Sequence, residues 1–467
     1  MYQKTRLGSY LLWISLCLLS RPAMADQFHY QNFLAGDRSL GMGGAYAGVA
    51  DDASSIYYNP AGAAFALSND ISGSANVIYK RDVVYKGAIA GQDFTEQSAG
   101  SVPSFFGGLI KLDNLMDGLS LSWGLYSLDS NLKDQDDYYE NVSLGNYTCP
   151  NGSESKPLRL DRFHRTVNAR ESSDYIGAAA SWRVSNRLAI GVGVNYITIS
   201  ELVQEYQDVK QTNYYCDTAN VPQEAKFTLT QNTRQMLTAF GLQPTLGFQL
   251  AATDRFSIGL NLKFGSYLAQ EFERRTETRT LKLLAADQAQ IDASSQAVSL
   301  NPQIMDAYHS PGNELKLDKP LGSMPSVARL GFAYFASTRL LLTTDVEHVS
   351  AVTDADIGDS LYGREAVTNM MAGIEYYTTP SLPVRLGFFT NNDARPVIDK
   401  NKVNQRDRVD FTGASVFLAW VQPNSQIGAG VVLQSGQGEA QKISNSKAVQ
   451  DVSGSAYSLA FSATTAL

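Results

Sequence analysis

Apolar and polar residues alternate with a period of two along most of the chain from residue 71 onward. In the clearest run, residues 119–126 (LSLSWGLY), apolar side chains take every second position. Residues 188–196 (LAIGVGVNY) repeat the pattern with small or polar partners between the apolar ones. This period indicates β-strands whose two faces meet different surroundings. The chain therefore predicts a protein built almost entirely of sheet.

Fourteen such strands follow one another as hairpins. Short turns, such as those at 185–187, 253–255, 337–339, 379–381 and 423–425, join them at one end, and long polar loops are expected near 128–173, 200–236 and 280–324. The third loop has apolar residues at a weak helical spacing, so we expect it to carry a helix. An even number of strands with short turns at one end is typical of a bacterial outer-membrane barrel. A soluble β-sandwich, the alternative, needs neither so many strands nor such uneven loops.

The first 25 residues have the features of a secretory signal peptide. Lys4 and Arg6 form a positive start, residues 7–19 an apolar core, and Ala23-Met24-Ala25 a small-residue cleavage pattern. No later segment contains a long uninterrupted apolar run. If the mature chain spans a membrane, it must therefore do so as a closed barrel.

Composition narrows the functional classes. The 467 residues carry a formal net charge of −8, and an acidic chain is a poor partner for nucleic acid. The four histidines show no metal-ligand spacing, and the glycines near residue 41 are not followed by the Lys-Ser/Thr of a phosphate loop. We therefore expect no metal, no cofactor and no enzymatic activity.

Removal of the signal peptide leaves two cysteines, Cys149 and Cys216, both in polar sequence. In an oxidising compartment two such cysteines suggest a disulfide bond. Two free thiols are the alternative.

Between the signal peptide and the first strand lies a segment rich in glycine and alanine. It contains the runs LGMGGA at 40–45, VADDA at 49–53 and NPAG at 59–62. In this order and spacing, the three runs resemble the N-terminal hatch of the FadL/TodX family of outer-membrane transporters of hydrophobic compounds and long-chain fatty acids. The resemblance covers about thirty residues and marks Gly41, Gly43, Gly44 and Asn59-Pro60-Ala61 as hatch residues.

The resemblance and the physics of barrels lead to the same architecture. A barrel of fourteen strands is too wide for its own side chains to fill, and the N-terminal segment is free to occupy it. We therefore predict an all-β, 14-stranded antiparallel transmembrane β-barrel (69–467) with an N-terminal hatch or plug (26–68) inside the lumen. The fixed φ of Pro60 and the amide of Asn59 suit the turn of such a plug.

The resemblance implies a porin-like monomer in the outer membrane, in contact with outer-membrane lipid, that takes up hydrophobic or amphipathic small molecules passively and releases them through the wall. Gly118 and Gly124 in the third strand are candidate positions for that lateral gap, since glycine weakens a strand. Related barrels with the same hatch imply the alternative of protein docking or a secretion shuttle. A surface adhesin is a further alternative.

Candidate ligand-binding residues follow from the strand register. The positions expected to face the lumen, with Phe28 added from the mature N-terminus, are Lys263, Arg329, Arg385, Phe335, Phe389 and Phe417. Aromatic rings with a few cations suit an amphipathic ligand whose carboxylate meets an arginine. Alternatively, these cations pair with the luminal acids Asp345, Glu347 and Glu375.

Overall fold

The structure, a computed structural model, describes residues 28–467 except 90, 150–151, 217–218, 220, 285–307, 355–362, 404 and 443–445. The predicted signal peptide lies outside the described residues. Three short helical turns near the N-terminus, α2 (Arg38–Gly41), α3 (Ser55–Tyr58) and η2 (Pro60–Phe65), precede a structure made of strands.

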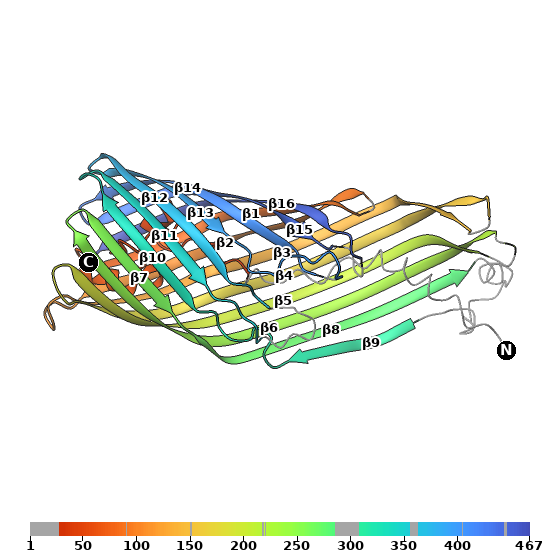
Figure 1. Cartoon of the computed structure of the whole chain (residues 1–467), viewed down its shortest axis with the longest axis horizontal. Helices are drawn as coiled ribbons and strands as arrows, with labels where there is room; N and C mark the ends of the chain where they lie inside the picture. Colours follow the sequence, from red (N-terminus) through yellow and green to blue (C-terminus); the bar gives the residue numbers. More distant parts are fainter. Residues whose placement is uncertain are drawn as a thin grey trace.

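Sixteen strand segments follow (Figure 1): β1 (Asp70–Ile89), β2 (Gln92–Lys111), β3 (Leu119–Thr148), β4 (Ser155–Arg183), β5 (Leu188–Cys216), β6 (Pro222–Thr253), β7 (Phe256–Lys263), β8 (Ser266–Leu284), β9 (Tyr308–Leu317), β10 (Val327–Phe335), β11 (Leu340–Val349), β12 (Val367–Thr379), β13 (Leu382–Asn391), β14 (Arg408–Gln422), β15 (Ser425–Ala440) and β16 (Gln450–Ala466).

The sheet closes on itself. Neighbouring strands are antiparallel, and β1 pairs with β16 from Asp70↔Ala466 onward. β6 pairs first with β7 and then with β8, so β7 and β8 are two parts of one strand. β9 and β10 are two parts of the next strand, since they pair with β8 and β7 respectively. The sixteen segments therefore make a closed 14-stranded antiparallel barrel, which confirms the predicted fold class.

Burial follows the alternation of the sequence but with apolar side chains outside. On β12, Met370 is 60% exposed while Met371 is 2% exposed. Exposed apolar residues form a band on the outer wall, including Leu125, Val192, Phe248, Leu386 and Trp420. Polar and small residues point inward and are buried. This is the inside-out pattern of a barrel whose outer wall meets lipid.

Among the described residues, no helix is long and apolar enough to cross a membrane.

The prediction of long loops near 128–173, 200–236 and 280–324 is corrected. Most of these residues continue as paired strands, so that β3, β4, β5 and β6 are 30, 29, 29 and 32 residues long. At about 3.3 Å per residue such strands reach roughly 100 Å, several times the 9–11 residues that cross a bilayer. Together with β8 and β9 they form a long extension at one end (Figure 1). The helix expected in 280–324 is absent from its described residues, where 280–284 and 308–317 are strand.

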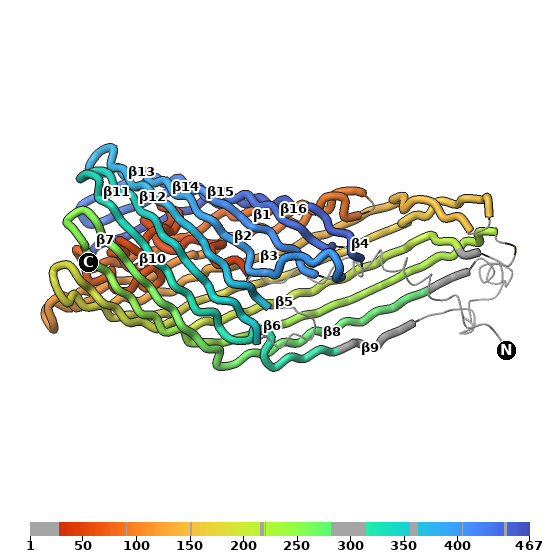
Figure 2. Tube along the Cα trace, viewed as in Figure 1, coloured from red at the N-terminus to blue at the C-terminus, as the bar shows by residue number. Residues whose placement is uncertain are grey.

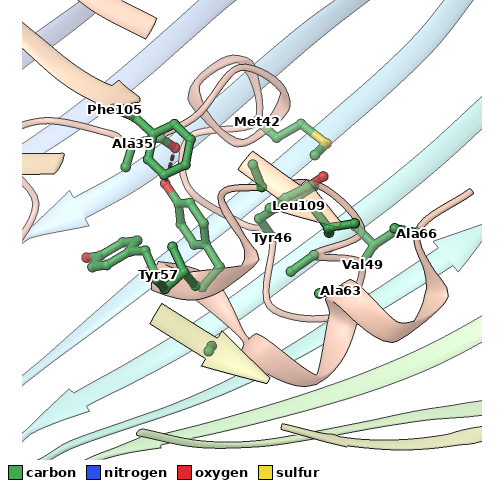
Figure 3. Close-up of a cluster of buried hydrophobic side chains, with 14 of the residues drawn as sticks. Ala35, Met42, Tyr46, Val49, Tyr57, Ala63, Ala66, Phe105 and Leu109 are labelled. Carbon is green, nitrogen blue, oxygen red and sulfur yellow. Dashed lines mark hydrogen bonds between the residues drawn. The ribbon is translucent and has the colours of Figure 1, made fainter. Parts of the chain in front are cut away.

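The N-terminal segment, defined here as residues 28–69, lies inside the barrel. Figure 2 shows it as the red part of the tube, surrounded by strands from all parts of the chain. Nearly all of residues 28–66 are buried. Tyr46, Ile56 and Tyr57 pack with Phe105 and Leu109 of β2 in one hydrophobic cluster (Figure 3).

Candidate functional site

The backbone of the N-terminal segment touches the wall at three places where two glycines face each other on paired strands. Gly387 pairs with Gly373, and a Cβ on Gly387 would lie 2.0 Å from the Gly43 nitrogen. Gly259 pairs with Gly331, and its Cβ would lie 1.9 Å from the Ala47 oxygen. The third pair, Gly191 and Gly247, meets Pro60 and Ala61 in the same way. The absence of side chains at these positions lets the two backbones approach closely.

Polar side chains of the wall and of the segment itself satisfy backbone groups where the two meet. Asp345 accepts hydrogen bonds from the nitrogens of Tyr46 and Ala47, at 3.1 and 2.9 Å. Asn59 donates to the oxygens of Ala47 and Phe248, at 3.0 and 3.1 Å, and accepts from Ala61. This is the role expected of Asn59, and Pro60 begins η2 beside it.

The luminal arginines are paired with acids. Arg329 binds Glu347 through two nitrogens, at 2.9 and 2.5 Å. Arg385 contacts Glu375 at 2.8 Å and Asp37 of the N-terminal segment at 3.3 Å. A second arginine, Arg38, shares Glu375 at 2.8 Å. These charges fasten the segment to the wall, as the alternative interpretation of the luminal cations expected.

The aromatic residues predicted to bind the ligand lie in different places. Phe389 and Phe417 are buried in one hydrophobic cluster with Leu34 and Leu40 of the N-terminal segment. Phe28 is 1% exposed, and the guanidinium of Arg395 lies 4.5 Å from its ring centroid. Phe335 is on the same face of β10 as the buried Arg329 and Ala333 and pairs with the buried Leu341, but at the end of the strand it is 36% exposed.

A cavity of about 90 Å³ lies between the N-terminal segment and the wall. Its lining is mainly apolar and aromatic, with a few polar groups: Tyr30, Tyr57, Leu128, Tyr175, Ile197, Ile199, Tyr267, Met324, Pro325, Val327, Val349, and also His29, Asp129, Ser173, Gln243, Lys263, Glu347 and Arg364. Apolar walls with a few polar groups are typical of small-molecule sites, although those sites commonly exceed 300 Å³. A long acyl chain would therefore need the surrounding side chains to move.

Lys263 is the predicted ligand-binding residue that lines this cavity. Its side chain is buried, and Nζ lies 3.7 Å from the centroid of the Tyr57 ring. Within the described part of the chain, no ion pair or hydrogen bond joins Nζ to another side chain. Nearby Glu347 is already occupied by Arg329 and by Gln31, which donates to it at 3.1 Å. Arg364 is the other lysine or arginine in the cavity lining, and Lys263 is the cation there that an incoming ligand can meet without breaking an ion pair among the described residues.

Stacked tyrosines form another side of the cavity. The rings of Tyr126 and Tyr175 are parallel within 7° at a centroid distance of 5.0 Å. Tyr57 meets Tyr126 edge to face at 5.5 Å. Such rings present flat apolar surfaces against which another aromatic or aliphatic group packs well. Tyr126 and Tyr175 lie in strands and Tyr57 lies in α3, so only the fold brings them together.

The two glycines proposed for a lateral gap differ in setting. Gly118 has a φ of +75° in the turn between β2 and β3, a conformation that favours glycine. Gly124 lies within β3, where a Cβ would be 3.3 Å from Ile56 of the N-terminal segment. Packing against Phe105 of β2, at 3.1 Å, and against the segment thus accounts for Gly124, and turn geometry for Gly118.

The ladder between β2 and β3 nevertheless ends early. Their pairing runs from Lys111↔Ser120 to Phe105↔Tyr126, and residues 92–104 of β2 have no ladder partner on β3. Side chains bridge this seam instead, with Lys133 of β3 bound to Glu96 of β2 at 2.8 Å. Burial alone would raise the pKa of Glu96, but Lys133, Lys442 and Arg165 hold the pKa well below its usual range. Gln135 of β3 also donates a hydrogen bond to the Thr95 oxygen at 2.7 Å and accepts one from the Gln97 nitrogen at 3.3 Å, so side chains hold the wall here in place of a ladder.

Cys149 is buried directly after β3, and Cys216 is the last residue of β5. The side chain of Cys216 lies outside the described residues, so the disulfide bond stays a prediction. In the described part of the chain, no three His, Cys, Asp or Glu side chains are grouped so that they could hold a metal ion.

A closed antiparallel barrel of fourteen strands, with its lumen occupied by its own N-terminal segment, defines the class of this protein. No family model and no curated protein matches the sequence. Solved structures, however, match the fold of this chain. A Pseudomonas aeruginosa FadL homologue matches 94% of this chain and 99% of its own, with a TM-score of 0.51 and 11% identity.

The Pseudomonas putida toluene transporter TodX matches 92% of this chain and 98% of its own, with a TM-score of 0.51 and 14% identity. The predicted resemblance is therefore confirmed at the level of the fold. Identities this low establish a common architecture and leave the solute to be argued from the site.

Proposed function

We propose that this protein is an outer-membrane passive transporter of hydrophobic or amphipathic small molecules, with the N-terminal segment acting as a hatch. The observation that carries the proposal is the cavity between the segment and the wall, apolar apart from a few polar groups that include the buried Lys263. The fold shared with the FadL homologue and with TodX, a toluene transporter, supports it. Catalysis is not required by any feature of this site.

The cavity chemistry favours a small amphipathic solute. A flat or aliphatic group can pack on Tyr57 and Tyr175 while an acidic or polar oxygen meets the ammonium of Lys263. Long-chain fatty acids fit this chemistry but exceed the present volume, so their binding requires a shift of the N-terminal segment. The solute then leaves through the wall, and the unpaired seam between β2 and β3 is one place where the wall can part.

A protein-docking or adhesive role is the second candidate. The specific observation in its favour is the long extension formed by β3, β4, β5, β6, β8 and β9, one edge of which is β9. An exposed strand edge can pair with a strand from another protein.

Purification in a mild detergent followed by native mass spectrometry separates the two candidates. Transport predicts a co-purified fatty acid or hydrocarbon that is lost when Lys263 and the cavity tyrosines are substituted. An empty lumen with a tightly held protein partner would instead favour docking. The same measurement reports whether the protein is a monomer, as we propose.

A further inference from the structure

The barrel wall has a second interruption of its ladder pairing, directly beside the cavity. The ladder between β7 and β10 stops at Lys263↔Val327, and the ladder between β8 and β9 starts only at Phe272↔Leu317. Between these points, residues 264–271 face residues 318–326 with no ladder pairing. We call these two stretches, all of them described, the ladder gap.

The sequence explains why pairing stops here. Pro320 and Pro325 lack the N–H that a ladder needs, and Gly322 turns the chain with a φ of +64°. On the neighbouring strand, Pro244 likewise cannot donate, although its oxygen accepts a hydrogen bond from Phe264 at 3.0 Å. The interruption therefore follows from the amino-acid sequence and forms without a ligand.

A single side chain fastens the two sides of the ladder gap. Gln270 accepts a hydrogen bond from the Leu321 nitrogen at 2.9 Å and donates to the Gly322 oxygen at 2.8 Å. Such a contact replaces the row of backbone hydrogen bonds that joins other strands. It can break without disturbing the ladders above and below it.

Met324 fills the space between the gap and the cavity. It is 7% exposed and lines the cavity, and its sulfur lies only 2.0 Å from where a Cβ on Gly265 would be. Its Cε lies 2.6 Å from the corresponding position on Gly241. Two glycines thus make room for one flexible thioether, whose three rotatable bonds let it swing aside at low cost.

The outer side of the ladder gap has apolar side chains on one border, whereas the exposed residues of the facing stretch, Asp318, Lys319, Ser323 and Ser326, are polar. Phe264 is 45% exposed and Leu268 is 64% exposed, both on the strand that borders the gap. On the inner side, Tyr267 and Gln243 line the cavity together with Met324. An amphipathic solute would therefore meet Phe264 and Leu268 outside the wall and Tyr267 inside it, with Met324 between them and polar groups along the facing border.

We propose that the ladder gap is a lateral port that connects the cavity with the outer face of the wall, gated by Met324 and latched by Gln270. The proposal rests on the proposed transport function and specifies a route for it. The port admits an apolar or amphipathic solute with a small cross-section, since the opening is bounded by the two ladders. It lies apart from the seam between β2 and β3, which is bridged by side chains of other residues.

Cysteines placed at Gln270→Cys and Ser323→Cys, joined by a short bis-maleimide, lock the port without altering the cavity. The probe is a pyrene-labelled fatty acid, with its uptake measured in proteoliposomes and its equilibrium binding measured in detergent. We expect the linked protein to lose at least about nine-tenths of its uptake while its binding affinity changes by less than about twofold. The same double variant without the linker is the matched control.

Met324→Ala should act in the opposite direction, with uptake roughly threefold or more faster, because the gate is shorter. Met370→Ala, which removes an equally large but exposed methionine from β12, is the control and should leave uptake unchanged. Heat-modified migration on gels shows whether each variant is folded. Unchanged uptake in the linked protein, with binding intact, would overturn the port. Wild-type protein that neither binds nor moves the probe would instead overturn the transport function, and the port with it.

Discussion

Lys263 is the residue on which recognition of the solute depends most. Its ammonium lines the cavity and contacts the Tyr57 ring without an ionic partner among the described residues. A ligand carboxylate would gain a charge-assisted hydrogen bond there, worth about 1.5–3 kcal/mol. The cavity should therefore distinguish amphipathic acids from neutral hydrocarbons.

Substitution of Lys263→Met tests this distinction. We expect the dissociation constant of a fatty acid to rise by about 10- to 150-fold, because the charge-assisted hydrogen bond is lost. For toluene the constant should change by less than about threefold, since its contacts are apolar. Isothermal titration in detergent measures both. Equal losses for the two ligands would mean that Lys263 supports the cavity without recognising charge.

Gly259 is the residue on which close docking of the N-terminal segment against the wall depends most. A Cβ on Gly259 would overlap the Ala47 oxygen, so Gly259→Ala should displace the N-terminal segment locally and cost about 1–3 kcal/mol of its docking. Single-channel recordings in planar bilayers should then show larger or more frequent openings. Gly100→Ala, whose Cβ would meet nothing closer than 3.7 Å, is the matched control and should remain as quiet as the wild type.

At the scale of single elements, the seam between β2 and β3 depends on ion pairs. Glu96 is held by Lys133 at 2.8 Å and by Lys442 at 2.6 Å, all with little exposure. The loss of one partner from such a buried cluster typically costs about 3–5 kcal/mol. Glu96→Gln should therefore loosen the part of β2 that precedes Phe105 and has no ladder partner on β3.

Hydrogen exchange measures this loosening. The amides of 94–102, whose ladder partners are on β1 alone, should exchange roughly tenfold or more faster in Glu96→Gln, while those of 105–111 stay protected by the ladder with β3. Lys86→Met is the control, because its ion pair with Asp93 is long, at 3.7 Å, and exposed. Equal protection across β2 in the Glu96 variant would show that the seam is held by packing alone.

The strands illustrate what the sequence could and could not predict. Period-two alternation is enough to assign the faces of β12, where Met370 points outward and Met371 inward. It fails beyond the apolar band, where runs such as 134–140 (DQDDYYE) are polar on their outer face and read as loops, although they form the long half of β3. It also does not show where inward packing stops at a strand end, as at Phe335, which lies on the inward-facing register but is 36% exposed.

At the scale of the whole molecule, the closed wall and the segment inside it could be predicted from the sequence, because the side chains of a 14-stranded barrel cannot fill its lumen. The sequence contains the glycines that contact the segment, but it does not show that they pair across strands, as Gly373 does with Gly387. That pairing follows only from the strand register of the structure. The cavity depends on which side chains meet across the lumen. No local pattern encodes such contacts between residues hundreds of positions apart.

The account as a whole treats the space between the N-terminal segment and the wall as the passage for an apolar solute. A crystal structure with a brominated fatty acid, located by its anomalous signal, tests this most directly. We expect the bromine peak inside the barrel, within the cavity bounded by Tyr57, Tyr175 and Met324, with the carboxylate toward Lys263. A saturating soak that leaves this cavity without a peak, and places bromine only on the outer wall, would contradict the account.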